Sequence, residues 1–266
     1  MSAEIYKPIF IVGSPRSGTS IFFRKMCQHP DLAYFTYTSK KFPRSVLLTR
    51  MISPFRHNHD PTEGRKVWGK FASGEDDSLD RSDVNPRARR YFSKAIFTQL
   101  KVMKKTRFVS KHPQNSLRMT YFHEIFPDAV FIHIVRDGRA VSRSLLQFRA
   151  RKGLEDKIRG CRPPGWRRLL TMEPLESCCY QWKMIVQHVR REAAQIPKDQ
   201  YMEVEYQDFM ARPDDVLRNV AKMCDLTWDE NHLKSIGTDL NNRNFKWKES
   251  FSKDQIERLN AIIEEA

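Results

Sequence analysis

The N-terminal part of the chain combines a short apolar run, a glycine-bounded turn and a helix-like stretch in direct succession. Residues 9–12 are Ile-Phe-Ile-Val, Gly13 and Gly18 bound the turn, and residues 19–28 precede Pro30. A β-branched apolar run that stops at glycine is typical of a buried strand, and proline cannot continue a helix. The sequence therefore predicts a strand, a tight loop and a helix.

The same alternation of strands and helices continues to the C-terminus. Further strands are predicted at 107–110, 130–135 and 201–205, and helices at 86–105, 115–126, 139–149, 174–195, 213–223 and after Phe251. Strands that alternate with helices form a parallel sheet that is covered on both faces. We therefore predict an α/β fold of three layers, with a central parallel β-sheet and a phosphate-binding strand–loop–helix unit.

The composition suits one globular domain over residues 1–266, of which 40% are hydrophobic. No apolar run is long enough to span a membrane, and Met1–Lys7 lacks the features of a secretory signal. Five cysteines form an odd set without metal-ligand spacing. Reduced, buried thiols in a cytoplasmic protein are the expectation.

The net charge of +15 favours a polyanionic partner. Nucleic acid, anionic lipid and a multiply charged nucleotide all meet that description. The sequence contains no zinc finger, RNA-recognition aromatic motif or clear helix-turn-helix, so no nucleic-acid partner is expected. A nucleotide that carries several phosphate charges is the better match.

The first loop has the composition of an anion-binding cradle. Residues 13–20 are Gly-Ser-Pro-Arg-Ser-Gly-Thr-Ser, and a helix N-terminus follows a glycine loop in many phosphate sites. The Gly-x4-Gly spacing is that of the nucleoside-triphosphate loop, which continues with a lysine and a hydroxyl residue. Here Thr19 replaces the lysine, and the cation is Arg16. The loop can grip a phosphate but lacks the residue needed for γ-phosphoryl transfer.

Residues 15–20, Pro-Arg-Ser-Gly-Thr-Ser, resemble the 5′-phosphosulfate loop of the sulfotransferases that use 3′-phosphoadenosine-5′-phosphosulfate (PAPS). The resemblance implies that backbone amides of Ser17, Gly18, Thr19 and Ser20, with the Thr19 and Ser20 hydroxyls, hold the 5′-phosphate. It also implies that Arg16 contacts the phosphosulfate.

A second phosphate site is predicted where the strand 130–135 ends. Ligands of parallel sheets bind beyond the carboxyl ends of strands, and a guanidinium there can clamp a phosphate. Arg136 holds this position and Ser144 follows eight residues later. This spacing resembles the 3′-phosphate motif of the same family, and the surrounding sequence especially resembles its tyrosylprotein branch. Arg139 and Arg143 are expected to be solvated or to pair with Asp137.

Two weaker matches lie further along the chain. Residues 204–208, Val-Glu-Tyr-Gln-Asp, resemble a family segment whose tyrosine packs near the adenosine, although Tyr206 is equally suited to the core. Residues 244–248 resemble a basic C-terminal loop that carries a tryptophan and closes over the nucleotide. The resemblance implies that Lys246 or Lys248 lies near a phosphate.

Sulfonyl transfer to a hydroxyl benefits from a base on the acceptor side and a cation on the leaving side. Cytosolic relatives place a lysine where Lys111 stands, so Lys111 is the candidate for the leaving side. The base is the open assignment. Stretch 34–38, where the tyrosylprotein branch has a glutamate, contains no acid. His112 is the candidate, and Asp31, His57 and His59 are alternatives.

These observations predict a metal-independent enzyme that transfers a sulfonyl group from PAPS to a small-molecule, lipid or carbohydrate hydroxyl and releases 3′-phosphoadenosine-5′-phosphate (PAP). Alternatives are a tyrosylprotein sulfotransferase, or a nucleotide-binding protein or kinase with a degenerate loop. Residues 36–105 and 150–172 are expected to cover the acceptor site. The basic stretch 143–168 suits a solvated face, or an acidic acceptor or peripheral contact with an anionic membrane.

Overall fold

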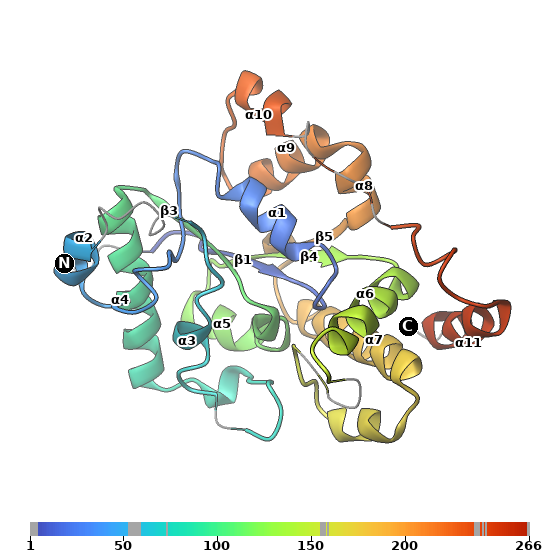
Figure 1. Cartoon of the computed structure of the whole chain (residues 1–266). Helices are drawn as coiled ribbons and strands as arrows, with labels where there is room; N and C mark the ends of the chain where they lie inside the picture. Colours follow the sequence, from blue (N-terminus) through green and yellow to red (C-terminus); the bar gives the residue numbers. More distant parts are fainter. Residues whose placement is uncertain are drawn as a thin grey trace.

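A twisted parallel sheet lies at the centre of the molecule (Figure 1). The computed structural model describes residues 5–52, 60–72, 74–154, 158, 160–236, 240, 242 and 244–264. The strands are β1 (Ile9–Val12), β2 (Leu32–Ala33), β3 (Arg107–Lys111), β4 (Val130–Val135) and β5 (Tyr201–Glu205). Their order across the sheet is β2-β3-β1-β4-β5, and every neighbouring pair is parallel. The predicted α/β class and parallel sheet are confirmed.

Helices connect and cover the strands (Figure 1). The α-helices are α1 (Thr19–Met26), α2 (Val46–Ile52), α3 (Arg65–Trp68), α4 (Pro86–Met103), α5 (Met119–Ile125), α6 (Gly138–Ala150), α7 (Pro174–Ala193), α8 (Tyr206–Ala211), α9 (Pro213–Met223), α10 (Glu230–Ile236) and α11 (Lys253–Glu264). Short 3-10 helices occupy Arg81–Asp83, Pro113–Leu117, Trp166–Thr171 and Lys198–Gln200. In the described part of the chain, no helix is both long and apolar enough to cross a lipid bilayer.

The strands divide their side chains between two cores. Phe10 and Phe131 point to one face and pack against α4, α5 and α7. Ile9 and Ile11 point to the other face and pack against α1, α8 and α9. Successive residues of a strand alternate between faces, so a strand buried on both faces is apolar throughout. This explains why the β1 and β4 sequences were recognisable as buried strands.

The helices α6, α7 and α9 begin and end within two residues of the predicted positions. Long α4 is also as expected: the Asn85 side chain accepts a hydrogen bond from the Ala88 amide, and Pro86 occupies the first helical position. Helices α2 and α3 lie in the irregular stretch 36–86, where loops and short helices are expected, but β2 and the short helices α8 and α10 were not predicted.

The order of the strands brings four carboxyl ends to one edge of the sheet. β1 ends just before Gly13, and its neighbours β3 and β4 end at Lys111 and just before Arg136. β5 ends next to Tyr206. After β1 the chain continues to β2 and β3 on one side of this strand, and after β3 it crosses to β4 on the other side. Open α/β sheets bind ligands at the carboxyl edge where the strand order reverses in this way. The sequence positions that were singled out as candidates therefore meet here.

Candidate active site

The β1–α1 loop is held in a conformation that few residues can adopt. Gly18 has φ +94°, and a Cβ at this position would lie 2.4 Å from Cδ2 of Tyr206. Arg16 also has a positive φ, of 72°, which is uncommon for a residue with a side chain. The Gly13 amide donates to Ser116 Oγ at 2.8 Å and so ties the loop to the 3-10 helix after β3. The tight cradle that the glycine spacing predicts is present.

The N-terminus of α1 suits an anion. No side chain of the described residues caps it, and its first turn contains no acidic residue. The first amides of a helix lack intrahelical acceptors and carry partial positive charge. The Ser17 hydroxyl is buried next to them and has no hydrogen-bond partner among the described residues. An anionic oxygen placed here would satisfy these donors.

Arg136 is buried at the end of β4, as predicted. Its Nε donates to Asn244 Oδ1 and its Nη1 donates to the Arg16 carbonyl, both at 3.1 Å. Its guanidinium lies 4.5 Å from the centre of the Tyr206 ring. Burial lowers the pKa of Arg136 from its usual value. The side chain is thus fixed by partners from the first loop, from α8 and from the C-terminal loop.

Ser144 completes the second predicted phosphate site from α6. Its hydroxyl accepts a hydrogen bond from Arg16 Nε at 2.9 Å. This contact joins the predicted 5′-phosphosulfate site, which contains Arg16, to the predicted 3′-phosphate site, which contains Ser144. The sequence analysis described them as two separate sites. Arg139 pairs with Asp137 at 2.8 Å, as expected.

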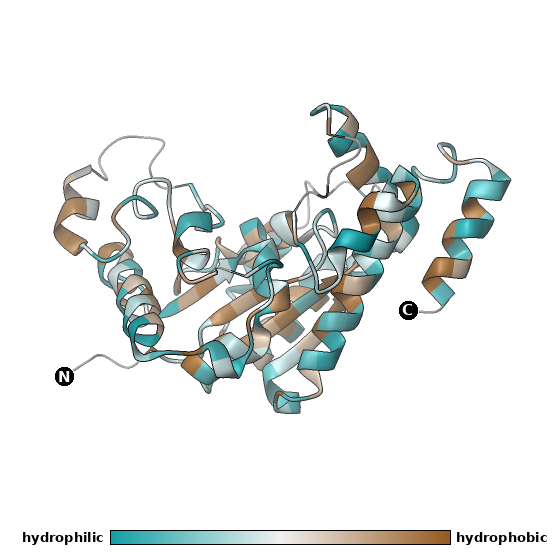
Figure 2. Cartoon of the chain, turned by 90° about the horizontal axis from the view of Figure 1, so that it is seen from below, coloured by the Kyte–Doolittle hydropathy of each residue, from teal (hydrophilic) through white to brown (hydrophobic). Residues whose placement is uncertain are grey.

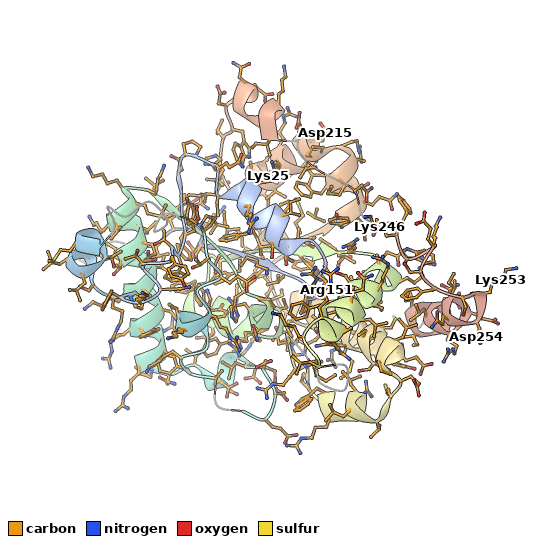
Figure 3. The ribbon with its side chains drawn as sticks, in the orientation of Figure 1. Lys25, Arg151, Asp215, Lys246, Lys253 and Asp254 are labelled. Carbon is orange, nitrogen blue, oxygen red and sulfur yellow. The ribbon has the colours of Figure 1, made fainter. Side chains whose placement is uncertain are left out.

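A cavity of about 640 Å³ opens between α1, α6 and the C-terminal loop. Figure 3 marks Lys246 and Arg151, which line it from that loop and from the end of α6. The lining residues are Arg16, Gly18, Thr19, Ser20, Ile21, Arg136, Ala140, Arg143, Ser144, Gln147, Arg151, Tyr206, Lys246 and Trp247. This lining has many cations and no carboxylate. We call it the donor cavity.

Several positions in and around the donor cavity differ from simple expectation. Arg143 lines it and donates to Ser250 Oγ at 2.6 Å, so it is not merely a solvated helix residue. Tyr206 is buried in the core and also lines the cavity. Lys248 lies outside the lining, with its Nζ 5.3 Å from the centre of the Phe245 ring. Arg151 also lines the cavity but was not among the residues predicted from the sequence.

A second cavity, of about 320 Å³, adjoins the first. We call it the acceptor cavity. It is lined by Pro15, Arg16, Ser20, Glu63, Arg65, Lys111, His112, Pro113, Gln114, Leu145, Phe148 and Gly160. Arg16 and Ser20 line both cavities. A group held at these two residues is therefore within reach of ligands on either side.

Lys111 stands at this junction together with an acid that the sequence analysis missed. Its Nζ donates to Ser20 Oγ at 3.0 Å and forms an ion pair with Glu63. The Lys111 side chain is 5% exposed, whereas that of Glu63 is 45% exposed. The buried cation thus faces the phosphate-binding loop, and the carboxylate extends into the acceptor cavity.

His112 also lines the acceptor cavity but is almost completely buried. Burial, helped by Arg118, Lys111 and Arg65, lowers its pKa to about 3. The imidazole is therefore a much weaker base than an ordinary histidine side chain.

The other candidate bases are not brought to the site. Asp31 precedes β2, and its carbonyl accepts from the Arg107 amide at the start of β3, so it lies at the opposite edge of the sheet. His57 and His59 lie outside the described residues.

The model of the Sulfotransferase family matches residues 8–230. This chain belongs to that family. The match includes both phosphate-site candidates, Lys111 and Glu63, and it ends before the C-terminal loop that carries Lys246. The resemblance predicted from residues 15–20 and 136–144 is confirmed.

The relatives act on different acceptors. The chain is 25% identical over 227 residues to the protein-tyrosine sulfotransferase of Drosophila melanogaster, covering 84% of this chain and 38% of that protein. It is 26% identical over 173 residues to an omega-hydroxy-beta-dihydromenaquinone-9 sulfotransferase of Mycobacterium bovis, covering 53% of this chain and 45% of that protein. In both comparisons the chain spans less than half of the relative's length.

Solved structures share the fold. The sulfotransferase STF9 from Mycobacterium avium superposes with a TM-score of 0.63 at 18% identity, over 99% of this chain and 76% of that chain. Mouse sulfotransferase SULT7A1, solved with PAP, gives 0.52 at 13% identity, over 100% of this chain and 90% of that chain. These likenesses support the three-layer α/β architecture.

Proposed function

We propose that this protein is a PAPS-dependent sulfotransferase that sulfonates a hydroxyl group and releases PAP. The observation that carries the proposal is the pair of adjoining cavities. One is lined by cations and has no acid, and the other contains a carboxylate. Their shared wall is formed by Arg16 and Ser20, and Lys111 donates to the Ser20 hydroxyl there. Membership of the Sulfotransferase family supports the same activity.

The residues of the donor cavity fit PAPS. The uncapped start of α1 and the buried Ser17 hydroxyl would hold the 5′-phosphate, with Thr19 and Ser20 beside them. Arg136 and Ser144 would hold the 3′-phosphate, and Lys246 would add a cation. When bound, PAPS supplies the sulfonyl group and the leaving phosphate.

On the acceptor side, we propose Glu63 as the general base. Its carboxylate is exposed to the acceptor cavity, where it can accept a proton from a hydroxyl. Lys111 is fixed beside Ser20 and would stabilise negative charge on the leaving side. His112 remains the second candidate, since it lines the same cavity. Its lowered pKa makes it the weaker of the two.

The acceptor cavity suits a small-molecule, lipid or carbohydrate hydroxyl. Its wall combines charged Arg65 and Glu63 with the apolar Leu145 and the half-exposed ring of Phe148. A tyrosylprotein acceptor is the alternative, which the relative in Drosophila melanogaster favours. Glu63, Arg65 and Gly160 belong to segments 36–105 and 150–172, which supports their proposed role as covers of the acceptor site within one domain.

We also propose that the protein is cytoplasmic. The five cysteines are free thiols in the structure, and all except Cys27 are buried. Burial raises the pKa of Cys178 and Cys179 to about 11, which makes them poorly reactive. These features support a cytoplasmic, reducing environment.

Calorimetric titration with PAP and with ATP, each with and without magnesium, tests the function. We expect tight PAP binding that does not depend on magnesium and much weaker ATP binding. An acceptor panel with labelled PAPS then identifies the hydroxyl class. Magnesium-dependent ATP binding that is tighter than PAP binding would instead favour a kinase-like protein.

A further inference from the structure

Two described segments, 36–52 and 60–61, meet where the first begins and the second ends. Thr36 and Pro61 form an antiparallel bridge, and the Thr62 amide donates to the Phe35 carbonyl at 2.7 Å. Helix α2 lies in the first of these segments, at the edge of the molecule and against α4 (Figure 1). Helix α2 lies on the β2 side of the sheet, whereas the donor cavity lies next to α1 and α6 on the other side of β1 (Figure 1).

The outer face of α2 is apolar. Leu47 is 69% exposed, Leu48 is 41% exposed and Met51 is 67% exposed. Figure 2 shows α2 as a hydrophobic segment at the periphery of the molecule. Single exposed apolar residues are ordinary, but three large ones on two turns of a peripheral helix form a patch that favours burial.

A basic groove lies between α4 and two other segments, one ending at Arg44, two residues before α2, and one at Lys70 and Phe71. It has a volume of about 550 Å³ and is lined by the cations Arg44, Lys70, Arg87, Arg90 and Lys94. All five cations are exposed, and none forms an ion pair with a carboxylate of the described residues. The Phe71 and Tyr91 rings form its floor, with centres 5.5 Å apart. We call this groove the α4 basic groove.

Two of the segments that contribute to the groove have charge of one sign. Residues 36–52 and 86–103 contain lysines and arginines but no Asp or Glu. Arg89, which points away from the groove, pairs with Glu124 of α5 at 3.2 Å. Segments 36–52 and 86–103 therefore bring only positive charge to the groove.

We propose that α2 and the α4 basic groove together form a docking surface for an anionic lipid bilayer. Exposed leucine and methionine insert among acyl chains, while adjacent arginine and lysine contact acidic headgroups. A nucleic acid or a sulfated glycan matches the cations but has no counterpart for the three apolar side chains. This combination of charge and exposed apolar surface favours the bilayer. The inference is independent of the proposed transfer reaction.

Vesicle co-sedimentation of the full chain tests the proposal. The vesicles contain phosphatidylcholine alone, or phosphatidylcholine with about 30 mol% phosphatidylserine, which gives the membrane a negative surface potential. L47S/M51S removes the apolar contact, and R87E/R90E reverses two groove charges. The controls are Leu170→Ser, an exposed leucine elsewhere on the surface, and K222E/K253E, two exposed lysines on α9 and α11. Thermal unfolding confirms that each variant is folded.

We expect binding to the anionic vesicles only, weakened about tenfold or more by each of the two test variants and little changed by the controls. Equal losses in K222E/K253E would show general attraction by the net charge and overturn the proposal. So would vesicle binding that L47S/M51S leaves intact, because it would show that headgroup charge alone holds the protein and that the α2 patch takes no part. A dimer in light scattering that L47S/M51S dissociates would assign the patch to a second copy instead. Absence of vesicle binding also overturns it.

Discussion

Glu63 and Lys111 form an ion pair with one buried and one accessible member. Replacing Glu63 by Gln keeps the size of the side chain but removes the base. We expect turnover to fall about 100-fold or more, the usual contribution of general base catalysis, with PAP affinity nearly unchanged. Rapid-quench or steady-state sulfonation assays give the turnover, and calorimetry gives the affinity.

The matched control for this substitution is Glu75→Gln, because Glu75 also pairs with a basic residue, Arg167, but lies outside the lining of both cavities. It should retain normal turnover. Normal turnover of Glu63→Gln, together with a large loss for His112→Gln, would transfer the role of base to His112.

The buried His112 makes stability depend on pH. Its folded pKa of about 3 lies below the unfolded value of 6.5, so the unfolded chain binds more protons in acid. The contribution of the neutral imidazole is complete above pH 6.5 and is lost as the pH falls toward 3. Between these pH values, His112 makes the free energy of unfolding decrease by up to about 1.4 kcal/mol for each pH unit of acidification.

The unfolding free energy of His112→Gln should therefore decrease less between about pH 6 and pH 4 than that of the unmutated protein, because both pH values lie between the folded and unfolded pKa of His112. Denaturant unfolding at several pH values measures this slope. His123→Gln controls for the loss of an imidazole. An unchanged slope in His112→Gln would mean that His112 is not buried as a neutral group in solution.

Arg136 is expected to recognise the 3′-phosphate. Arg136→Ala should weaken PAP about 10- to 100-fold, since a hydrogen bond to a charged group contributes about 1.5–3 kcal/mol. Binding of adenosine 5′-phosphosulfate, which lacks the 3′-phosphate, should change much less. Arg139→Ala, which removes a neighbouring arginine paired to Asp137, is the control. Equal losses for both nucleotides would contradict the assignment.

At the scale of the element, the β1–α1 loop depends on the absence of a side chain at Gly18. Gly18→Ala combines a positive φ with a Cβ that would overlap the Tyr206 ring, so the loop must shift. Gly153 also has a positive φ, of 59°, but a Cβ there meets nothing within 4 Å. Gly153→Ala thus measures backbone strain alone, about 1 kcal/mol.

We expect Gly18→Ala to lower both PAP affinity and the melting temperature clearly more than Gly153→Ala does. Thermal unfolding with and without PAP measures both effects. Similar behaviour of the two variants would mean that the contact with Tyr206 does not shape the loop.

The elements that the sequence predicted are those with a strong periodic or apolar signal. β1, β4, α6, α7 and α9 have such signals and were placed closely. β2 has two residues, too few for any pattern, and it is stabilised only by pairing with β3. The helix predicted from residue 115 begins at Met119, because Pro113–Leu117 forms a 3-10 turn instead.

The same reasoning explains why the phosphate-binding side of the site was predictable and Glu63 was not. Arg16, Arg136 and Ser144 follow strands directly, so local sequence places them at the carboxyl edge. Glu63 reaches that edge because the Thr36–Pro61 bridge closes a long excursion. This pairing joins residues that are distant in sequence, and an irregular segment gives no periodic signal for it.

At the scale of the whole molecule, charge is unevenly distributed. The donor cavity and the α4 basic groove concentrate cations, while several carboxylates elsewhere on the surface pair with arginines, such as Glu203 with Arg190 and Glu230 with Arg218. Long-range attraction therefore guides anions toward these two regions, and salt screens it.

The wall shared by the two cavities has a kinetic consequence. Because Arg16 and Ser20 border both, donor and acceptor would meet across it within a single ternary complex. Initial rates measured against both substrates should then give reciprocal plots that intersect, and PAP should compete with PAPS. Parallel lines would instead reveal a sulfonated enzyme that outlives the departure of PAP, with the first product leaving before the second substrate arrives.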